Sequence, residues 1–258
     1  MRYGWEFYYE YANTTDMKKL KKKLLKYFMD YMRIWDNVSS NRVDYFIANS
    51  ENVARRIWKH YRRESVVIHP PVRCNLFNIS DEDEDYFLIV SRLVEYKKID
   101  LAIEAFNELR LPLIIIGDGS EREKLESKAK GNIKFLGRQP DNVIKKYYSK
   151  CRAFIFPGEE DFGITPLESQ ASGRPVIAFG KGGALETVID RQTGIFFDEQ
   201  TVDELKLAVK KFQNIDFDKK VIRKHAEEFD EAIFKGKIKD FIDEKYEEFV
   251  NTKKWKVL

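Results

Sequence analysis

The stretch that decides the fold is YFLIVSRLVEYKKIDLAIEAFNELRLPLIII, residues 86–116. Residues 86–90 form an apolar run with the length of a buried strand, and residues 99–109 repeat apolar side chains at helical spacing. A second apolar run over 112–116 ends at Gly117. Apolar strands that alternate with helices predict βαβ units and a parallel sheet covered on both faces. The predicted fold class is therefore α/β, a doubly wound, Rossmann-like parallel sheet.

The same alternation continues toward the C-terminus. Further strands are expected over residues 133–136, 153–156, 176–179 and 194–197, and further helices over 120–130, 142–149, 165–172, 184–188, 202–212 and about 234–250. In sheets of this kind ligands bind beyond the carboxyl ends of the strands. The loops that follow the strands are therefore where binding and catalytic residues are expected.

The N-terminal residues predict a smaller α/β segment. The expected elements are a helix over 17–36, a strand over 43–48, a helix from a cap at Asn49 or Ser50 through about His60, and a strand over 66–68. Two prolines at 70 and 71 and an acidic run over 81–85 then interrupt the pattern. We expect three parts, which are residues 1–70, 71–232 and 233–258.

The composition narrows the classes of function and compartment. The 258 residues carry a formal net charge of +3, which gives no reason to expect a nucleic-acid partner. Cys74 and Cys151 show no metal-ligand spacing and are typical of a reducing cytosol. No apolar run of about 18 residues exists and Met1 leads directly into an aromatic stretch, so neither a membrane span nor a signal peptide is expected. We expect a cytoplasmic protein.

Two basic clusters leave a choice open. They are residues 18–26 (KKLKKKLLK) and residues 55–63 (RRIWKHYRR). Each can be a solvated helix face. Each can also be attracted to an anionic membrane surface or a lipid phosphate, which would place the protein peripherally on the inner face of a membrane.

The loop after the first strand of the deciding stretch contains two cations, Arg92 and Lys97. Arginine offers a planar fork of donors and lysine a compact point charge, and both bind phosphate oxygens. Two such cations at the carboxyl end of a strand can clamp a pyrophosphate. The alternative is a solvated loop, because lysine and arginine are abundant throughout this chain.

The segment FPGEEDFGITPLE, residues 156–168, has two interpretations. In the structural one, Thr165 caps a helix, Pro166 takes its first position and Glu168 completes a capping box. In the functional one, the helix start binds an anion and Gly163 lets the backbone approach a ligand. The four acidic residues of this segment then accept hydrogen bonds from hydroxyl groups of a sugar or ribose.

Other motifs predict turns and structural roles. The segment GKGGALE, residues 180–186, opens a short helix and is either a plain tight turn or part of the site. Gly117-Asp118-Gly119 lacks the third glycine of a dinucleotide fingerprint and is expected to be a turn. The three histidines, at 60, 69 and 225, show no metal-ligand spacing and are expected to be structural.

Taken together, these loops resemble the signature segments of family 4 retaining glycosyltransferases. The matching segments are Arg92-x4-Lys97, Phe135-Leu136-Gly137-Arg138, Glu160-x7-Glu168, Gly182-Gly183-x-x-Glu186 and Thr193-Gly194-Ile195-Phe196. Within this family, the amino-acid sequence of residues 92–109 and 159–163 most resembles a mannosyltransferase branch that acts in O-antigen-type polysaccharide assembly. One departure is Lys98, which stands where the family often has glycine.

The resemblance implies an acceptor domain followed by a donor domain, both Rossmann-like. Residues 1–70 would be the C-terminal remnant of the acceptor domain, residues 71–232 the nucleotide-sugar domain, and residues 233–258 a helix that returns toward the acceptor domain. The implied reaction is retaining hexosyl transfer from a nucleotide sugar, GDP-mannose above others, to a glycan or lipid-linked acceptor, with no metal and no other cofactor. The alternative is a truncated or split-gene subunit that binds a nucleotide sugar and is inactive without an acceptor-domain chain or self-association.

The resemblance also implies the roles of single residues. Arg92 and Lys97 would hold the donor pyrophosphate, and together with Glu160, which would contact sugar hydroxyls, they form the expected catalytic set. Glu168 would hold the ribose. The turn at Gly137 and Arg138 would lie along the nucleobase. The backbone of Phe162, Gly163, Ile164 and Thr165 would contact the sugar and the phosphate.

Overall fold

The computed structural model describes Trp5 and residues 19–251, which divide into two compact units. The first unit takes in the described residues up to Ala48 together with Ala54–Val66. The second unit takes in Asn49–Val53 and the described residues from Val67 onward.

The first unit contains two helices and two short strands. They are α3 (Lys19–Ser40), β1 (Ile47–Ala48), α4 (Glu51–Tyr61) from Ala54 onward, and β2 (Val66–Val67), which pairs with β1. The first three residues of α4 and the last residue of β2 belong to the second unit. The helix expected over 17–36 is confirmed from Lys19 and runs on to Ser40, whereas its first two positions lie outside the described residues. Ser50 is the cap of α4, as one of the two alternatives expected, because its Oγ accepts a hydrogen bond from the Val53 amide at 3.1 Å.

The first strand is shorter than expected. Strand pairing is limited to Ile47–Ala48, whereas the sequence predicted residues 43–48. The Arg63 guanidinium accounts for the difference, because it donates to the carbonyl oxygens of Val43 at 2.8 Å and Asp44 at 3.0 Å. These backbone groups thus have a side-chain partner in place of a strand partner.

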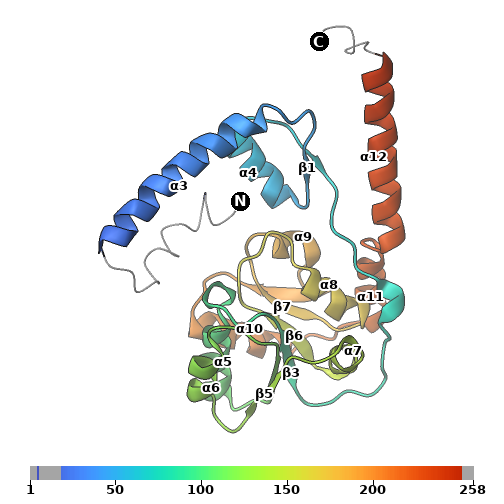
Figure 1. Cartoon of the computed structure of the whole chain (residues 1–258). Coiled ribbons are helices and arrows are strands. Elements are labelled where there is room, and N and C mark those ends of the chain that lie inside the picture. The colour runs from blue at the N-terminus through green and yellow to red at the C-terminus, as the bar shows by residue number, and fades with distance from the viewer. Residues whose placement is uncertain (1–4, 6–18, 252–258) are drawn as a thin grey trace. The chain divides into compact units, whose positions relative to one another are not determined.

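The second unit is built on a six-stranded parallel sheet with the order β5-β4-β3-β6-β7-β8 (Figure 1). Its strands are β3 (Phe87–Val90), β4 (Leu113–Ile116), β5 (Ile133–Gly137), β6 (Ala153–Phe156), β7 (Val176–Phe179) and β8 (Gly194–Phe197). The chain winds outward from β3 through β4 to β5, then crosses to β6 and winds outward on the other side. The predicted α/β, doubly wound parallel sheet is confirmed.

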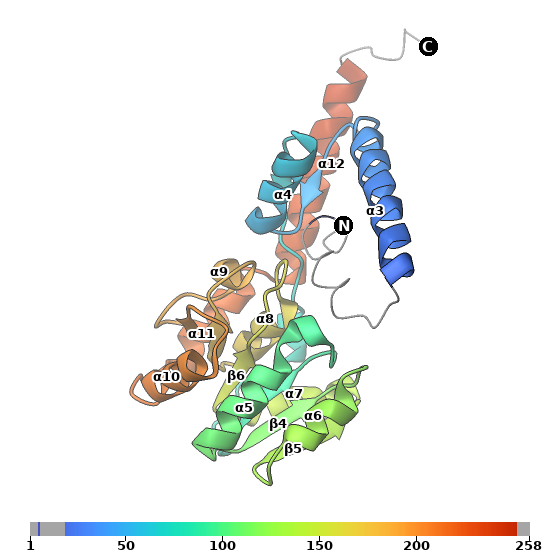
Figure 2. The same cartoon turned by 90° about the vertical axis from the view of Figure 1, so that its left-hand side faces the viewer.

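Helices cover both faces of this sheet (Figure 2). They are α5 (Ile99–Leu109), α6 (Arg122–Lys128), α7 (Asp141–Lys150), α8 (Ile164–Ala171), α9 (Ala184–Thr187), α10 (Val202–Phe212) and α11 (Lys219–Glu227), with short 3-10 turns η1 (Cys74–Leu76) and η2 (Glu95–Lys97). The last helix, α12 (Glu231–Asn251), has no buried residue and belongs to neither face. Helix α11 was not expected from the sequence. Its N-terminus is capped by Asp218, whose carboxylate accepts hydrogen bonds from two backbone amides of the first turn.

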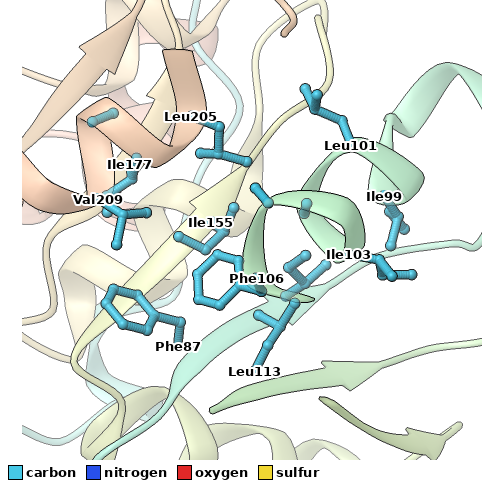
Figure 3. Packing of buried hydrophobic residues seen from close by; sticks show 14 of the residues in the cluster. Phe87, Ile99, Leu101, Ile103, Phe106, Leu113, Ile155, Ile177, Leu205 and Val209 are labelled. Atoms are coloured by element: carbon cyan, nitrogen blue, oxygen red, sulfur yellow. The ribbon is translucent and has the colours of Figure 1, made fainter. Parts of the chain in front are cut away.

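Two hydrophobic cores flank the sheet, because successive side chains of a strand point to opposite faces. On β3, Phe87 and Ile89 pack into the core that α5 and α10 cover, and Figure 3 shows Phe87 beside Phe106 and Val209 there. Leu88 packs into the opposite core, with side chains of α7, α8 and α11. Among the described residues, no helix is both long enough and apolar enough to cross a membrane.

Candidate active site

The loops predicted to contain the site all lie at the end of the sheet where the parallel strands have their carboxyl ends. Strands β3 and β6 are neighbours at the point where the chain reverses its winding direction. In open parallel sheets this switch point is where adjacent loops turn away from each other and leave a crevice. The loop after β3 contains Arg92 and Lys97, and the loop after β6 contains Glu160.

The structure brings Lys97 and Glu160 together. The Nζ atom of Lys97 forms an ion pair with the Glu160 carboxylate, and the two side chains are 21% and 17% exposed. Gly158 allows this approach, since a Cβ at that position would lie 3.0 Å from the Cα of Lys97. Arg92 lies in the same loop as Lys97, with an exposed side chain. A cation and a carboxylate from two loops thus meet at the switch point.

The Gly117-Asp118-Gly119 segment supports the loop that contains Arg92. The amide of Leu93 donates to the Asp118 carbonyl at 3.0 Å, and a Cβ at Gly119 would lie 2.2 Å from the Leu93 carbonyl oxygen. Residues 117–119 form the loop that follows β4, and the hydrogen-bonded turn comes directly after it, where the Arg122 amide donates to the Gly119 carbonyl at 3.2 Å. Because Gly119 has no side chain, the backbone of this loop can lie against the backbone of Leu93. The Gly-Asp-Gly sequence by itself does not show this contact.

The glycine turn after β7 supports the Glu160 loop in the same way. The Gly183 amide donates to the Glu160 carbonyl at 2.8 Å, and a Cβ at Gly183 would lie 2.2 Å from the Cα of Phe162. At Gly182, where φ is +64°, a Cβ would lie 2.4 Å from the Glu160 carbonyl oxygen. The backbone of Glu160–Phe162 is therefore held against the Gly182-Gly183 turn.

The predicted capping box at Thr165 is wrong. Helix α8 begins at Ile164, and its N-cap is Gly163, with φ of +96° and no side-chain cap. Thr165 and Pro166 therefore occupy the second and third helical positions. A left-handed cap is available only because the residue is glycine, and it starts the helix two residues earlier than a threonine cap would. The first amides of α8 are left for a ligand or for water.

Glu168 has a different partner from the one that a capping box requires. Its carboxylate accepts a hydrogen bond from the Tyr148 hydroxyl at 3.0 Å. Burial raises the pKa of Glu168 above its ordinary value, whereas the bond from Tyr148 lowers it by less. Tyr148 is fully buried in α7, and burial together with Glu168 raises its own pKa well above the usual range.

A cavity of about 320 Å³ opens beside Glu168 within the second unit. Its lining includes Val90 at the end of β3, Ile164 at the start of α8, and the charged side chains of Asp141 and Lys145 on α7. Sequence reasoning missed Asp141, Lys145 and Tyr148. Their spacing along one helix that follows β5 was the available signal, but nothing in it distinguishes a ligand-facing helix from a solvated one.

The predicted nucleobase turn stands directly before α7. Gly137 ends β5 with φ of +65°, and a Cβ there would lie 3.2 Å from the Arg122 guanidinium. Arg138 follows with an exposed side chain. The structure thus places this turn in the same chain segment as Asp141, which lines the cavity.

Comparison with known families assigns the second unit. The profile described as "Glycosyl transferases group 1" matches residues 77–233, which is more than half of the chain. The chain belongs to this family. The family resemblance predicted from the loop motifs is confirmed.

Several named relatives of this glycosyltransferase chain are mannosyltransferases. Alpha-1,3/1,6-mannosyltransferase ALG2 of Dictyostelium discoideum is 25% identical over 252 residues, covering 78% of this chain and 59% of its own length. The GDP-mannose-dependent alpha-(1-6)-phosphatidylinositol monomannoside mannosyltransferase of Mycolicibacterium smegmatis is 32% identical over 145 residues, covering 49% of this chain and 38% of its own length. The predicted resemblance to mannosyltransferases is confirmed.

Solved structures show the same fold. Sucrose-phosphate synthase of Thermosynechococcus elongatus superposes with a TM-score of 0.74 at 19% identity, covering 84% of this chain and 62% of its own. The chain therefore spans less than two thirds of the length of each of these three proteins.

Proposed function

We propose that the second unit binds a nucleotide sugar and supplies the donor half of a hexosyl transfer, with GDP-mannose as the donor. The observation on which this rests most is the Lys97–Glu160 ion pair at the switch point, between the loops after β3 and β6. One relative of the chain is named as GDP-mannose-dependent, which supports the choice of guanosine and mannose.

The leaving diphosphate requires positive charge at this edge. Arg92 and Lys97 supply two cations, and the first turn of α8 supplies backbone amides with the positive end of a helix dipole. Charge that is already in place when the sugar–phosphate bond breaks stabilises the departing diphosphate without reorganisation. In this proposal Arg92, Lys97 and α8 do the work that a metal does elsewhere, and no metal is required.

The two glutamates would then hold hydroxyl groups. Glu160 keeps its carboxylate next to Lys97, so it can accept from sugar hydroxyls while the lysine reaches a phosphate oxygen. Glu168 faces the cavity with its Tyr148 bond in place and can accept from the ribose hydroxyls. The turn at Gly137 and Arg138 would lie along the base. Retention of configuration follows from the family resemblance.

Transfer also needs a bound acceptor, a glycan or a lipid-linked sugar. Holding the acceptor hydroxyl against the reacting carbon can supply about 7–11 kcal/mol of the barrier. We propose that the 258 residues transfer sugar only together with an acceptor-binding part, either continuous with this chain or in a separate chain. The exposed apolar side chains along α3 support such a contact or self-association, among them Tyr27, Phe28 and Tyr31 at 58–65% exposure.

Calorimetric titration tests the donor proposal. GDP, UDP, GDP-mannose and UDP-glucose are titrated into the purified chain with a chelator present. We expect GDP and GDP-mannose to bind, and GDP-mannose to bind more tightly than UDP-glucose. No heat and no thermal shift with any of the four at millimolar concentration would overturn the proposal.

An assay of sugar transfer tests the proposal that an acceptor-binding part is required. The chain is incubated with labelled GDP-mannose and lipid-linked acceptors, and labelled glycolipid is measured. We expect none from the chain alone. Clear turnover without any added polypeptide would show that the 258 residues already contain a complete acceptor site.

A further inference from the structure

Glu186 holds three groups at once, all within the second unit. Its carboxylate accepts hydrogen bonds from the backbone amides of Glu51 at 2.8 Å and Asn52 at 3.0 Å. Its Oε2 atom also lies 3.1 Å from Nε2 of His69. The Glu186 side chain is 13% exposed and that of His69 28%, so both partners of this contact are partly shielded from solvent.

His69 connects this carboxylate to the proposed donor site. The imidazole ring stacks on the Phe162 ring, with centroids 5.2 Å apart and planes 15° apart. Both rings also contact Phe229, at 5.4 Å and 5.9 Å. Phe162 is 3% exposed and belongs to the segment that begins with Glu160. The ring that Glu186 orients is therefore the ring on which this segment packs.

Glu186 reaches the same segment by a second route. It stands on α9, a short helix that directly follows the Gly182-Gly183 turn. That turn bonds to the Glu160 carbonyl at 2.8 Å and packs on the Cα of Phe162. A carboxylate anchored at one end of α9 restrains the turn at the other end. The backbone of Glu160–Phe162 is thus held from the His69 side and from the glycine side.

We propose that Glu186 is a positioning residue for the Glu160–Phe162 segment and thereby for recognition of the sugar part of the donor. This inference rests on the proposed function, in which Glu160 and the neighbouring backbone contact the sugar. Glu186 touches neither the nucleotide nor the sugar in this proposal. Its substitution should therefore weaken binding of a nucleotide sugar more than binding of the nucleoside diphosphate alone.

The decisive variant is Glu186→Gln. The amide keeps one acceptor oxygen but places an NH2 group where the other oxygen met an N–H donor. We expect the dissociation constant of GDP-mannose to rise about fivefold to tenfold, which is the effect of losing one such bond. That of GDP should change less than about twofold. His69→Phe keeps the ring stack without the bond to Glu186, so its effect and that of Glu186→Gln should not add.

A measurement without ligand accompanies the titrations. Amide hydrogen exchange of peptides that cover residues 158–163 and 182–183 should become faster in Glu186→Gln than in the wild type. The matched control is Glu108→Gln, which also removes a carboxylate from an ion pair of the second unit, with Lys206 on α10. It should change neither the exchange of these peptides nor either dissociation constant.

The outcomes separate the inference from the proposed function. If exchange in both peptides is unchanged, or if GDP and GDP-mannose weaken by the same factor, Glu186 is only a cap for α4 and the inference is overturned. If the wild type binds no nucleotide and exchange still becomes faster, the proposed function fails while the positioning role stands. Circular dichroism of each variant confirms that folded protein is compared.

Discussion

The two ends of the segment from Glu160 to Glu168 lie in opposite environments. Glu160 is paired with the Lys97 ammonium at the edge of the sheet. Glu168 is partly buried beside the Tyr148 hydroxyl, and this burial raises its pKa. In the sequence the two glutamates form one regular signature. In the structure one carboxylate is matched to a cation and the other to a buried tyrosine hydroxyl, so the two cannot have interchangeable roles.

The largest expected effect comes from removing the cation at the Glu160 end. Lys97→Ala deletes one charge-assisted phosphate contact, which costs about 1.5–3 kcal/mol, or roughly tenfold to a hundredfold in GDP affinity. Calorimetry measures it. Lys128→Ala, which removes the lysine of an exposed ion pair with Glu104, is the control and should bind GDP as the wild type does. Equal affinity of Lys97→Ala and the wild type would remove Lys97 from the phosphate site.

The Glu168 end is tested next. Glu168→Gln keeps an acceptor for the Tyr148 hydroxyl but has no charge, so GDP affinity should fall about fivefold because a neutral acceptor binds ribose hydroxyls less strongly. Because burial raises the pKa of folded Glu168 above its ordinary value of 4.5, the folded protein retains a proton that the unfolded chain releases. The unfolding free energy of the wild type should therefore fall as pH rises from about 4.5 through the folded pKa.

Urea unfolding of both proteins across this range measures the difference. The Gln variant lacks the Glu168 contribution to the pH slope, so its stability relative to the wild type should increase with pH. An identical slope in both proteins would mean that Glu168 ionises in the folded state as readily as in the unfolded chain. Affinity that stays at the wild-type value would instead argue against the ribose contact.

A smaller effect separates the real helix cap from the expected one. The Thr201 side chain accepts a hydrogen bond from the Glu204 amide at the start of α10, so Thr201→Ala should lower the unfolding free energy by about 1 kcal/mol. Thr165 lies inside α8 and caps nothing, so Thr165→Ala should change it by less than about 0.5 kcal/mol. Chemical denaturation of the two variants side by side checks this. A loss of unfolding free energy in Thr165→Ala as large as that in Thr201→Ala would show that Thr165 does cap α8.

The smallest effect concerns the neighbour of Lys97. Lys98 has φ of +53° and ψ of +37°, a left-handed conformation that costs most residues other than glycine about 1–2 kcal/mol. Glycine would remove this strain, but its greater conformational freedom stabilises the unfolded chain and offsets part of the gain. Lys98→Gly should therefore stabilise the fold by up to about 1 kcal/mol. Thermal and urea unfolding measure it. Any loss of stability would show that the Lys98 side chain has a compensating contact.

Much of the fold was predictable because its signals are local. The boundaries of β6, β7, β8, α5 and α10 agree with the predicted ranges, since each is an apolar run or a helical repeat between clear breaks. Helix α11 was missed because its sequence, KKVIRKHAE, is mostly charged and buries only a narrow stripe. The start of α8 was misplaced because threonine before proline is a strong capping signal, and only the backbone shows that Gly163 has already taken that place.

The sequence by itself determined the α/β class, the order of the strands along the chain, and which loops follow the carboxyl ends of those strands. It did so because hydrophobic periodicity and turn residues act within a few positions of each other. Only the tertiary structure decided that Lys97 pairs with Glu160, that Tyr148 bonds to Glu168, and that Glu186 joins His69 to the first turn of α4. These contacts join side chains from separate loops and helices, whose distances depend on how the elements pack against the sheet.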